Sequence, residues 1–375
     1  MTTPLRVAQV MGYMNGGGVE SVVMNYYRHI DRTKVQFDFI VCERSEHVPA
    51  EEIESLGGRL FLVPEYKALP NFINRLIDLF RTEGWHIVHS HLNTLSVFPL
   101  FAAKRAGVPV RIAHSHSSLG GGEGEGARDV IKSVLRRFSN IYPTHRFACG
   151  DLAGSWLFRG APFEIVPNAI DLVSFRSDSD VRNKVRSELG IADNTFVVGH
   201  IGRMVPVKNH RRLLSIFSVL SGLCPNSVLV LVGDGELSDE VREEAEELGL
   251  QDKVLFLGLR LDAARLYQAF DVFCLPSAYE GFPVVSVESQ ASGTPILASS
   301  AVSRETAITS LMQFESLESP DLTWARHLLA MKDAALTEAD AKALLSYDID
   351  TSARKLEEAY ASLCEAIPAV GDDAE

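Results

Sequence analysis

Short apolar segments alternate with longer amphipathic stretches along most of the 375-residue chain, and this alternation restricts the fold more than any other feature. Apolar strands separated by helical stretches indicate parallel sheets that are covered by helices on both faces. The segments fall into two series, so the sequence predicts an α/β protein with two Rossmann-like domains. The first series is Arg6–Val10, Phe37–Val41, Arg59–Val63, Ile87–Ser90, Val110–Ala113, Arg146–Cys149 and Glu164–Val166, and the second is Phe196–His200, Val228–Val232, Val254–Leu257, Val272–Leu275 and Ile296–Ala298.

The boundary between the domains is predicted near the turn-rich segment Pro167–Asp171. We expect an N-terminal domain over residues 1–172, a C-terminal domain over 173–350 and a final segment over 351–375. In that segment, Ser352–Leu363 predicts an amphipathic helix, and the tail from Ala369 is expected to be disordered. Ligands of open α/β sheets bind beyond the carboxyl ends of the strands, so we expect the active site in the cleft between the domains.

Charge and cysteine content exclude several classes of protein. A formal net charge of −13 argues against general nucleic-acid binding. Five scattered cysteines without a CxxC pair indicate reduced thiols. The first residues lack the pattern of a signal peptide, and no apolar run approaches the ~18 residues of a membrane span. The sequence therefore predicts a cytoplasmic protein.

Two glutamates stand eight positions apart across a predicted loop and helix start. Glu280 follows the strand that ends near Ser277, and Glu288 lies on a helix that begins near Pro283 and ends near Gly293. Carboxylates beside a helix N-terminus suit a ligand with hydroxyls at both ends and anionic charge between them. A nucleotide sugar has this layout. On the spacing alone, a solvated helix face with two unrelated acids explains the pattern about equally well.

Two cations close another strand in the second series. Arg203 and Lys208 can converge on one diphosphate, because a fork-shaped donor and a compact ammonium complement each other. They would stabilise a departing nucleoside diphosphate without a metal. The sequence has no DxD motif before a sheet edge, no HExxH and no Cys/His cluster, so we predict no metal and no cofactor. Two solvated surface cations are the alternative.

Three consecutive glycines, Gly16–Gly18, separate the first strand from the helical stretch Val22–Ile30. Glycine lets the backbone approach a ligand closely, and the helix that follows offers unbonded N–H groups. The run is not the GxGxxG dinucleotide fingerprint. A flexible turn explains it as well as a phosphate-facing loop.

Histidines gather in the first half of the chain at His86, His89, His91, His114 and His116. Four of them end two neighbouring strands, His89 with His91 and His114 with His116. Side chains at strand ends project toward the expected cleft, so one or two of these four could meet a substrate.

The order of these motifs resembles that of retaining glycosyltransferases of family GT4. The similarity is greatest to the capsular and exopolysaccharide branch, and it extends over about residues 7–317. It rests on Met24–Asp31, His114-Ser115-His116, Lys208-Asn209-His210 and Glu280–Pro283. The resemblance implies the GT-B fold, in which two Rossmann-like domains with parallel sheets face a cleft. It also implies that the first domain holds the acceptor and the second the nucleotide-sugar donor, with the final helix returning to the first domain.

The resemblance also implies roles for individual residues. Glu280 would hold hydroxyls of the donor sugar and Glu288 those of the ribose, while Arg203 and Lys208 would bind the diphosphate. The remaining implied site residues are Gly17 and Gly18 through their amides, Phe282 and Val284 at the helix start, Arg260 near the base and His116 near the reaction centre. One departure from many relatives is Ala301–Glu305, which replaces a glycine-rich segment.

A glycine-rich segment, Leu119–Gly126, precedes the cationic amphipathic stretch Val130–Ser139. We predict that the first is a mobile loop on the acceptor side. The second contains Lys132, Arg136 and Arg137 and could contact anionic lipid head groups. Such a contact would place the protein at the inner face of the membrane and suits a lipid-linked acceptor. An ordinary solvated helix is the alternative.

Together these features predict a metal-independent retaining glycosyltransferase of polysaccharide or glycoconjugate biosynthesis. It would move a sugar from a nucleoside-diphosphate sugar to a hydroxyl of a saccharide or lipid-linked saccharide. Two alternatives are a nucleotide-sugar 2-epimerase of similar two-domain build and a non-catalytic sugar-binding partner subunit.

Overall fold

The computed structural model describes residues 3–117 and 127–366, and the chain divides into two compact units. Unit 1 comprises Met1–Ala169 together with Ile349–Glu375, and unit 2 comprises Ile170–Asp348. The boundaries expected from the sequence, at 172/173 and 350/351, thus differ by a few residues from those of the units. The predicted loop Leu119–Gly126 and the tail from Ala369 lie outside the described residues.

Unit 1 is built on a sheet of seven parallel strands in the order β3-β2-β1-β4-β5-β6-β7. The order places β1 and β4 side by side at the centre, so their carboxyl ends lie at one edge of the sheet. Every strand predicted in the first series is present, with ends that shift by up to two residues. The strands are β1 (Leu5–Gly12), β2 (Val35–Cys42), β3 (Arg59–Val63), β4 (Ile87–Ser90), β5 (Val110–Ser115), β6 (His145–Ala148) and β7 (Glu164–Ile165).

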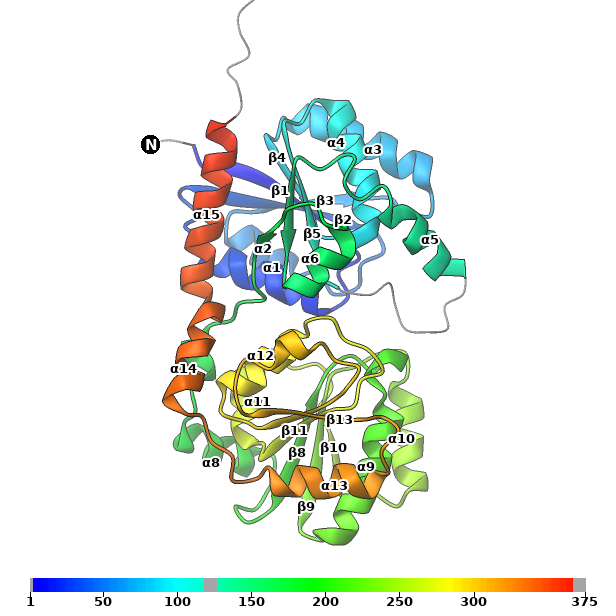
Figure 1. The fold of residues 1–375 in the computed structure, drawn as a ribbon, viewed down its shortest axis with the longest axis vertical. Coiled ribbons are helices and arrows are strands. Elements are labelled where there is room, and N and C mark those ends of the chain that lie inside the picture. Colours follow the sequence, from blue (N-terminus) through cyan, green and yellow to red (C-terminus); the bar gives the residue numbers. More distant parts are fainter. Residues whose placement is uncertain (1–2, 118–126, 367–375) are drawn as a thin grey trace, which may run out of the picture. The chain divides into compact units, whose positions relative to one another are not determined.

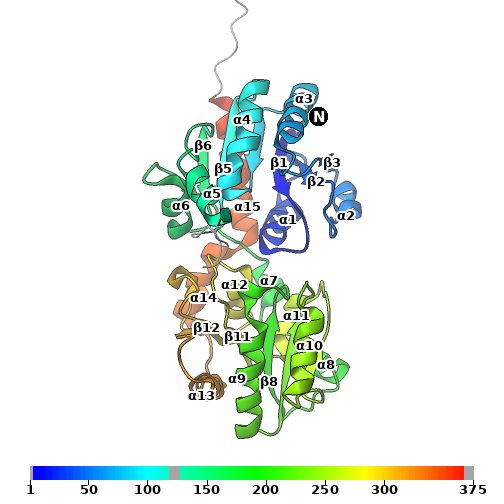
Figure 2. The ribbon, with the colours of Figure 1, turned by 90° about the vertical axis from the view of Figure 1, so that its right-hand side faces the viewer.

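Helices cover both faces of this sheet (Figures 1 and 2). Successive side chains of a strand point to opposite faces, so Ala8 and Val10 of β1 join the core beneath α3, α4 and α6, while Gln9 faces α1 and α15. Helix α15, drawn in red in Figure 1, packs against α1 and belongs to unit 1 although it ends the described chain. The helices are α1 (Gly18–His29), α2 (Ala50–Ser55), α3 (Leu69–Glu83), 3₁₀ helix η1 (Asn93–Ser96), α4 (Val97–Ala106), α5 (Ala127–Arg136), α6 (Asp151–Phe158) and α15 (Ile349–Glu365).

Unit 2 repeats the plan with six parallel strands in the order β10-β9-β8-β11-β12-β13. Its strands are β8 (Phe196–Ile201), β9 (Ser227–Val232), β10 (Val254–Phe256), β11 (Val272–Leu275), β12 (Ile296–Ser299) and β13 (Met312–Glu315). The sequence analysis missed β13. β13 lies at the edge of the sheet, and its sequence, Met-Gln-Phe-Glu, alternates apolar and polar residues. It therefore has no apolar run that would mark it as a strand.

The core of unit 2 lies between the sheet and helices α9, α10 and α13, with Phe217 and Trp324 among its largest buried side chains. The bounds of its helices are α7 (Leu172–Phe175), α8 (Ser179–Glu188), η2 (Pro206–Lys208), α9 (His210–Leu223), α10 (Ser238–Glu247), α11 (Ala263–Ala269), α12 (Val284–Ala291), η3 (Arg304–Thr306), α13 (Asp321–Ala330), α14 (Glu338–Leu344) and η4 (Leu345–Tyr347). No helix among residues 3–117 and 127–366 combines the length and apolar character needed to cross a membrane.

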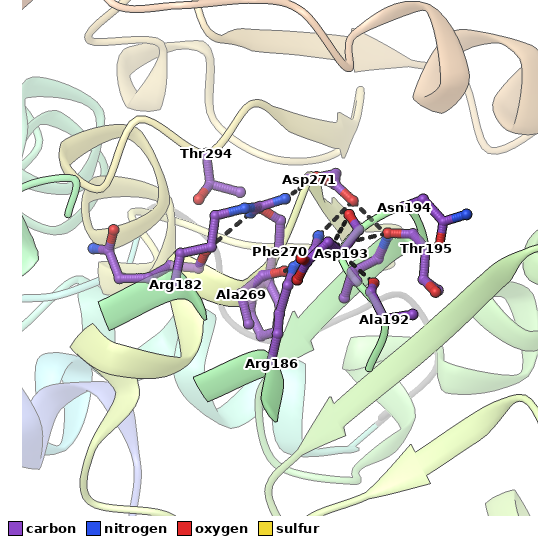
Figure 3. Close-up of polar contacts among 12 residues, drawn as sticks. Arg182, Arg186, Ala192, Asp193, Asn194, Thr195, Ala269, Phe270, Asp271 and Thr294 are labelled. Atoms are coloured by element: carbon purple, nitrogen blue, oxygen red, sulfur yellow. Dashed lines mark hydrogen bonds and ion pairs between the residues drawn. The ribbon is translucent and has the colours of Figure 1, made fainter. Parts of the chain in front are cut away.

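A partly buried ionic network fixes the start of β11 (Figure 3). Asp271 accepts hydrogen bonds from Arg182 at 2.5 Å, from Arg186 at 2.8 Å and from the amide of Val197 in β8 at 2.7 Å. Arg186 is almost completely buried and donates also to the carbonyls of Ala269 and Thr195, at 3.1 and 3.0 Å. Since each buried charge is paired and hydrogen-bonded, the network anchors α8 and β11 to β8. It thereby holds the strand whose far end leads to Glu280.

Candidate active site

Four histidines meet at the carboxyl ends of β4 and β5 in unit 1. His89 Nε2 lies 3.1 Å from His114 Nδ1, and His91 Nδ1 lies 2.9 Å from His116 Nε2. The rings of His114 and His116 stack with their centroids 3.9 Å apart. As expected from the sequence, these strand ends gather the histidines. His86 is exposed and precedes β4, at the other end of that strand.

The four rings are deeply buried. His89, His91 and His114 are at most 5 % exposed, and His116 is 9 % exposed. Burial disfavours the charged imidazolium, so it holds the pKa of the first three rings well below the usual value and lowers the pKa of His116 to about 3. The cluster is therefore neutral near pH 7. His116 is the most exposed of the four, and the expectation that one or two of them meet a substrate stays a prediction.

Two partners of this cluster carry no signal in the sequence. Gln9 Oε1 accepts a hydrogen bond from His91 Nε2 at 2.8 Å, and Tyr360 Oη lies 2.7 Å from His89 Nδ1. Tyr360 comes from α15, more than 300 residues away from Gln9 along the chain, and Gln9 Nε2 donates to its hydroxyl at 3.2 Å. No local pattern could have indicated a contact over this separation.

Three of these histidines also have the geometry of a metal-binding group. One ligand nitrogen from each of His89, His91 and His114 lies within 4.8 Å of the others. The sequence showed no Cys/His cluster, because the two strands bring together residues that are about 25 positions apart. Both ring nitrogens of His89 and of His91 already take part in hydrogen bonds, so a metal would have to replace those bonds.

The glycine loop of unit 1 already holds a carboxylate. The side chain of Glu20 accepts hydrogen bonds from the amides of Gly17 and, at 3.0 Å, Asn15 at the start of α1. Carboxylates are common at this position because they accept hydrogen bonds from the unbonded N–H groups and are attracted to the positive end of the helix dipole. The amide of Gly17, predicted to meet the diphosphate, is therefore engaged by Glu20. Gly18, the other predicted contact, is exposed and opens α1.

In unit 2, the predicted cation and the predicted acid lie in direct contact. Lys208 Nζ is 2.6 Å from Glu280 Oε1, and Ser277 Oγ donates to the same oxygen at 3.1 Å. Both charged side chains are only 16 % exposed. Lys208 ends the 3₁₀ turn η2 after β8, and Glu280 follows β11, so two neighbouring parallel strands deliver them to one edge of the sheet.

The second predicted acid, Glu288, is partly buried on α12 and accepts a hydrogen bond from Tyr267 Oη at 3.1 Å. Burial raises its pKa to about 7, while Tyr267 and the nearby Lys208 act in the opposite direction. The interpretation of two solvated acids on a helix surface is therefore wrong. Tyr267, which orients Glu288 from α11, was not found by the sequence analysis.

The backbone around Gly202 is packed against the loop after β9. The amide of Met204 donates to the carbonyl of Asp234 at 2.9 Å, and a Cβ on Gly233 would lie 2.1 Å from the carbonyl oxygen of Gly202. Glycine is thus required at Gly233, whose φ is also +129°. The adjacent Arg203 is exposed, and its side chain has no ion pair or hydrogen bond with any residue in the described part of the chain.

The other predicted donor contacts are spread around this edge. Phe282 is buried and its ring stacks on that of Tyr347, while Val284 opens α12, where the first N–H groups of a helix have no acceptor within it. Arg260 follows β10 and forms a two-bonded ion pair with Asp262, at 2.7 and 2.8 Å. Its guanidinium is therefore held by Asp262, and a role for it toward a nucleotide base stays a prediction.

The sequence matches two families of glycosyltransferases. Residues 16–174 match the family described as "Glycosyltransferase Family 4", and residues 181–310 match "Glycosyl transferases group 1". The chain is 39 % identical over 330 residues to a Bacillus subtilis (strain 168) protein named "Putative glycosyltransferase EpsF", with 85 % of this chain and 86 % of that protein covered. It is 27 % identical over 319 residues to the "UDP-Gal:alpha-D-GlcNAc-diphosphoundecaprenol alpha-1,3-galactosyltransferase" of Escherichia coli, covering 79 % of each.

Solved structures share the fold at low sequence identity. The Anabaena protein Alr3699/HepE, crystallised with UDP-glucose, has a TM-score of 0.78 at 19 % identity, covering 95 % of this chain and 99 % of its own. A sucrose-phosphate synthase of Thermosynechococcus elongatus also has a TM-score of 0.78, at 18 % identity, covering 96 % and 99 %. These likenesses confirm the predicted GT-B fold. The chain therefore belongs to glycosyltransferase family GT4, in its exopolysaccharide branch.

Proposed function

We propose that this glycosyltransferase moves a sugar from a nucleoside diphosphate to an acceptor hydroxyl with retention of anomeric configuration and without a metal ion or other cofactor. The observation that carries the proposal is the 2.6 Å contact between Lys208 and Glu280. In a nucleotide sugar the diphosphate is bonded directly to the anomeric carbon. A cation and a hydroxyl-binding carboxylate that touch each other match this junction, with Lys208 on the phosphate and Glu280 on the sugar.

The same contact explains why no metal is needed in the proposal. Negative charge develops on the phosphate oxygen as its bond to the anomeric carbon breaks, and fixed cations stabilise that charge. Lys208 supplies one cation, and the exposed Arg203 supplies a second after a change of side-chain conformation. The acceptor oxygen bonds to the anomeric carbon from the face that the phosphate leaves, and the acceptor proton passes to the departing phosphate oxygen.

Glu288 is assigned to the ribose in this proposal. An ionised carboxylate can accept from two neighbouring hydroxyls, and Tyr267 holds one of its oxygens in place. Because its pKa is about 7 in the free protein, a fraction of the molecules carries a neutral Glu288 at pH 7. Binding of a ribose diol would favour the ionised form.

The named relatives suggest the first substrates to test. The Escherichia coli relative is named for UDP-Gal and a diphosphoundecaprenol-linked acceptor, and the Anabaena structure contains UDP-glucose. We therefore propose a UDP-hexose as donor and a lipid-linked saccharide as acceptor. The location that fits such an acceptor is the inner, cytoplasmic face of a membrane.

Helix α5 and the turn after it offer a surface for that membrane. Val130, Ile131, Val134, Phe138 and Ile141 are between 44 and 64 % exposed. Arg137 is also exposed beside them. An apolar face flanked by cations favours binding at an anionic bilayer surface.

Product analysis tests the proposal directly. Protein with UDP-hexose and a lipid-linked saccharide analogue should yield a product whose anomeric configuration equals that of the donor, with the same rate after exhaustive EDTA treatment. Inversion of configuration, or loss of turnover that Mg²⁺ or Mn²⁺ restores, would contradict it. Donor incubated without acceptor separates a 2-epimerase, which would convert it, from a transferase. A non-catalytic subunit would show neither reaction.

Vesicle sedimentation tests the membrane contact. Phe138→Ser should weaken binding to vesicles that contain anionic phospholipid by roughly tenfold, because the variant lacks an aromatic side chain that would be buried in the bilayer surface. Leu261→Ser, at a fully exposed leucine of unit 2, is the matched control and should bind as the wild type does. Equal binding of both variants would remove α5 from the proposal.

A further inference from the structure

The buried hydrogen bonds of unit 1 join end to end into one chain of six side chains. Its five links measure 2.9, 2.8, 3.2, 2.7 and 3.1 Å between nitrogen or oxygen atoms. Three links join two groups that can each donate or accept, and the Gln9 amide can be turned over to exchange its oxygen and nitrogen, so the distances alone do not fix where the protons lie. In order, the chain runs His116, His91, Gln9, Tyr360, His89 and His114.

Neutrality restricts each ring to a single proton. Burial lowers the pKa of all four histidines, so near pH 7 each ring donates from one nitrogen and accepts at the other. In such a chain the direction of one link determines the direction of the next. The whole chain therefore has two states, which run in opposite directions.

The distances at Tyr360 select one direction. The Tyr360 hydroxyl lies 2.7 Å from His89 Nδ1 but 3.2 Å from Gln9 Nε2. A hydroxyl donates over about 2.7–2.8 Å, whereas 3.2 Å is at the long end for an amide N–H donor and too long for a good O–H donor. Tyr360 therefore donates to His89 and accepts from the Gln9 amide nitrogen.

This direction turns the Gln9 carbonyl oxygen toward His91. His91 must then donate from Nε2 and accept at Nδ1, and the donor to that Nδ1 is Nε2–H of His116. At the other end His89 donates to His114, whose Nε2 is buried without a partner among the described residues. The cavity that these rings line has room for roughly one water molecule, which could accept a hydrogen bond from Nε2–H of His114.

We propose that Gln9 and Tyr360 are positioning residues that fix the proton of His116 on Nε2, so that His116 presents the lone pair of Nδ1 to a hydroxyl of the substrate. The second half of this statement rests on the proposed glycosyl transfer, and the first half does not. Nδ1 of His116 bonds to no other described residue, and at 9 % exposure His116 is the most exposed of the four rings. The opposite tautomer would offer an N–H there, and a hydroxyl would have to accept instead.

Nitrogen NMR of the protein labelled with ¹⁵N-histidine tests the tautomer without any substrate. The His116 resonances are assigned by their loss in His116→Asn. In the wild type at pH 7.5, Nε2 should have the shift of a protonated nitrogen and Nδ1 that of a bare one. Tyr360→Phe removes the donor to His89 and the acceptor of the Gln9 amide, which frees the amide to turn over. His116 should then be a mixture of two tautomers. The ratio of the form protonated on Nε2 to the form protonated on Nδ1 should fall by roughly tenfold. Gln9→Met, which removes the middle of the chain, should do the same.

Tyr26→Phe is the matched control. Tyr26 lines the same cavity, but its hydroxyl donates to the carbonyl of Pro167 and stands outside the chain. This variant should keep the single tautomer of His116. A proton on Nδ1 in the wild type, or an unchanged His116 in both Tyr360→Phe and Gln9→Met, would overturn the proposal. This NMR measurement needs neither a sugar donor nor an acceptor substrate, so its outcome is independent of the proposed reaction. In that reaction, Tyr360→Phe should lower kcat by roughly tenfold.

Discussion

The carboxyl ends of the two sheets carry opposite chemistry on the same architecture. At β4 and β5 of unit 1, four buried imidazoles are neutral and are joined in two pairs by hydrogen bonds. At β8 and β11 of unit 2, Lys208 and Glu280 form an ion pair that is only partly covered. Neutral groups with fixed protons can recognise hydroxyls at little electrostatic cost, whereas fixed positive charge would stabilise the diphosphate that leaves in the proposed reaction. The comparison teaches that the Rossmann-like frame fixes where a site lies, while burial decides whether the groups there are charged.

The largest effect should come from Glu280→Gln, which tests the charged region. If Glu280 accepts from the donor sugar, replacing its carboxylate by an amide should lower kcat/KM about a hundredfold, from the loss of two charge-assisted bonds. Calorimetric titration should show unchanged affinity for the nucleoside diphosphate, which has no sugar. Glu288→Gln is the counterpart and should weaken that same affinity. Equal weakening in both variants, or in neither, would end the division of roles between the two acids.

Lys208→Ala should have the next largest effect. Removal of the ammonium from the leaving phosphate costs roughly 1.5–3 kcal/mol, or about one to two decades in kcat/KM. Lys253→Ala, at a partly exposed lysine of the same unit that hydrogen-bonds a carbonyl, should have no effect. Steady-state kinetics with the cognate donor decide the matter, and wild-type rates in Lys208→Ala would take this residue out of the site.

The stability of the charged region should fall as the pH rises. Burial raises the pKa of Glu288 from 4.5 in the unfolded chain to about 7 in the folded protein. The folded state therefore holds a proton that the unfolded state has lost, and this contribution disappears as the pH approaches 7. Between pH 6 and 8 the free energy of unfolding of the wild type should fall by about 1.4 kcal/mol relative to Glu288→Gln. Urea unfolding of both proteins would show it, and parallel pH profiles would contradict it.

The neutral region should respond in the opposite direction and by a slightly smaller amount. The pKa of His116 is lowered from 6.5 in the unfolded chain to about 3 in the folded protein, so the unfolded state takes up a proton first as the pH falls. From pH 7 to 5.5 the wild type should lose about 1 kcal/mol relative to His116→Asn. Tyr26→Phe should follow the wild-type profile, because it leaves every histidine in place. A His116→Asn profile parallel to that of the wild type would indicate an exposed, protonated ring.

The sequence was sufficient for the sheets but only partly sufficient for the site. Twelve strands could be predicted from short, largely apolar runs, and β13 escaped because its sequence, Met-Gln-Phe-Glu, alternates apolar and polar residues over only four positions. Lys208 and Glu280 were each predicted to follow a strand, but their contact was not predicted, because it depends on β8 and β11 being neighbours in the sheet. What escaped prediction were partners set by packing between distant segments, such as Tyr267 on Glu288 and Glu20 on the glycine loop. No local periodicity encodes such contacts.

The place of α15 has a consequence for the order of assembly during synthesis. Domains usually fold as they leave the ribosome, the N-terminal one first. Here Leu356 and Tyr360 cover Gln9 and His89 of the first unit, and they are translated after every residue of the second. During synthesis, the histidine side of unit 1 therefore stays uncovered until α15 is made, by which time every residue of unit 2 has already been translated. The part of the enzyme that is made first is finished last, so only a chain translated through α15 can complete the core of unit 1 around its histidines.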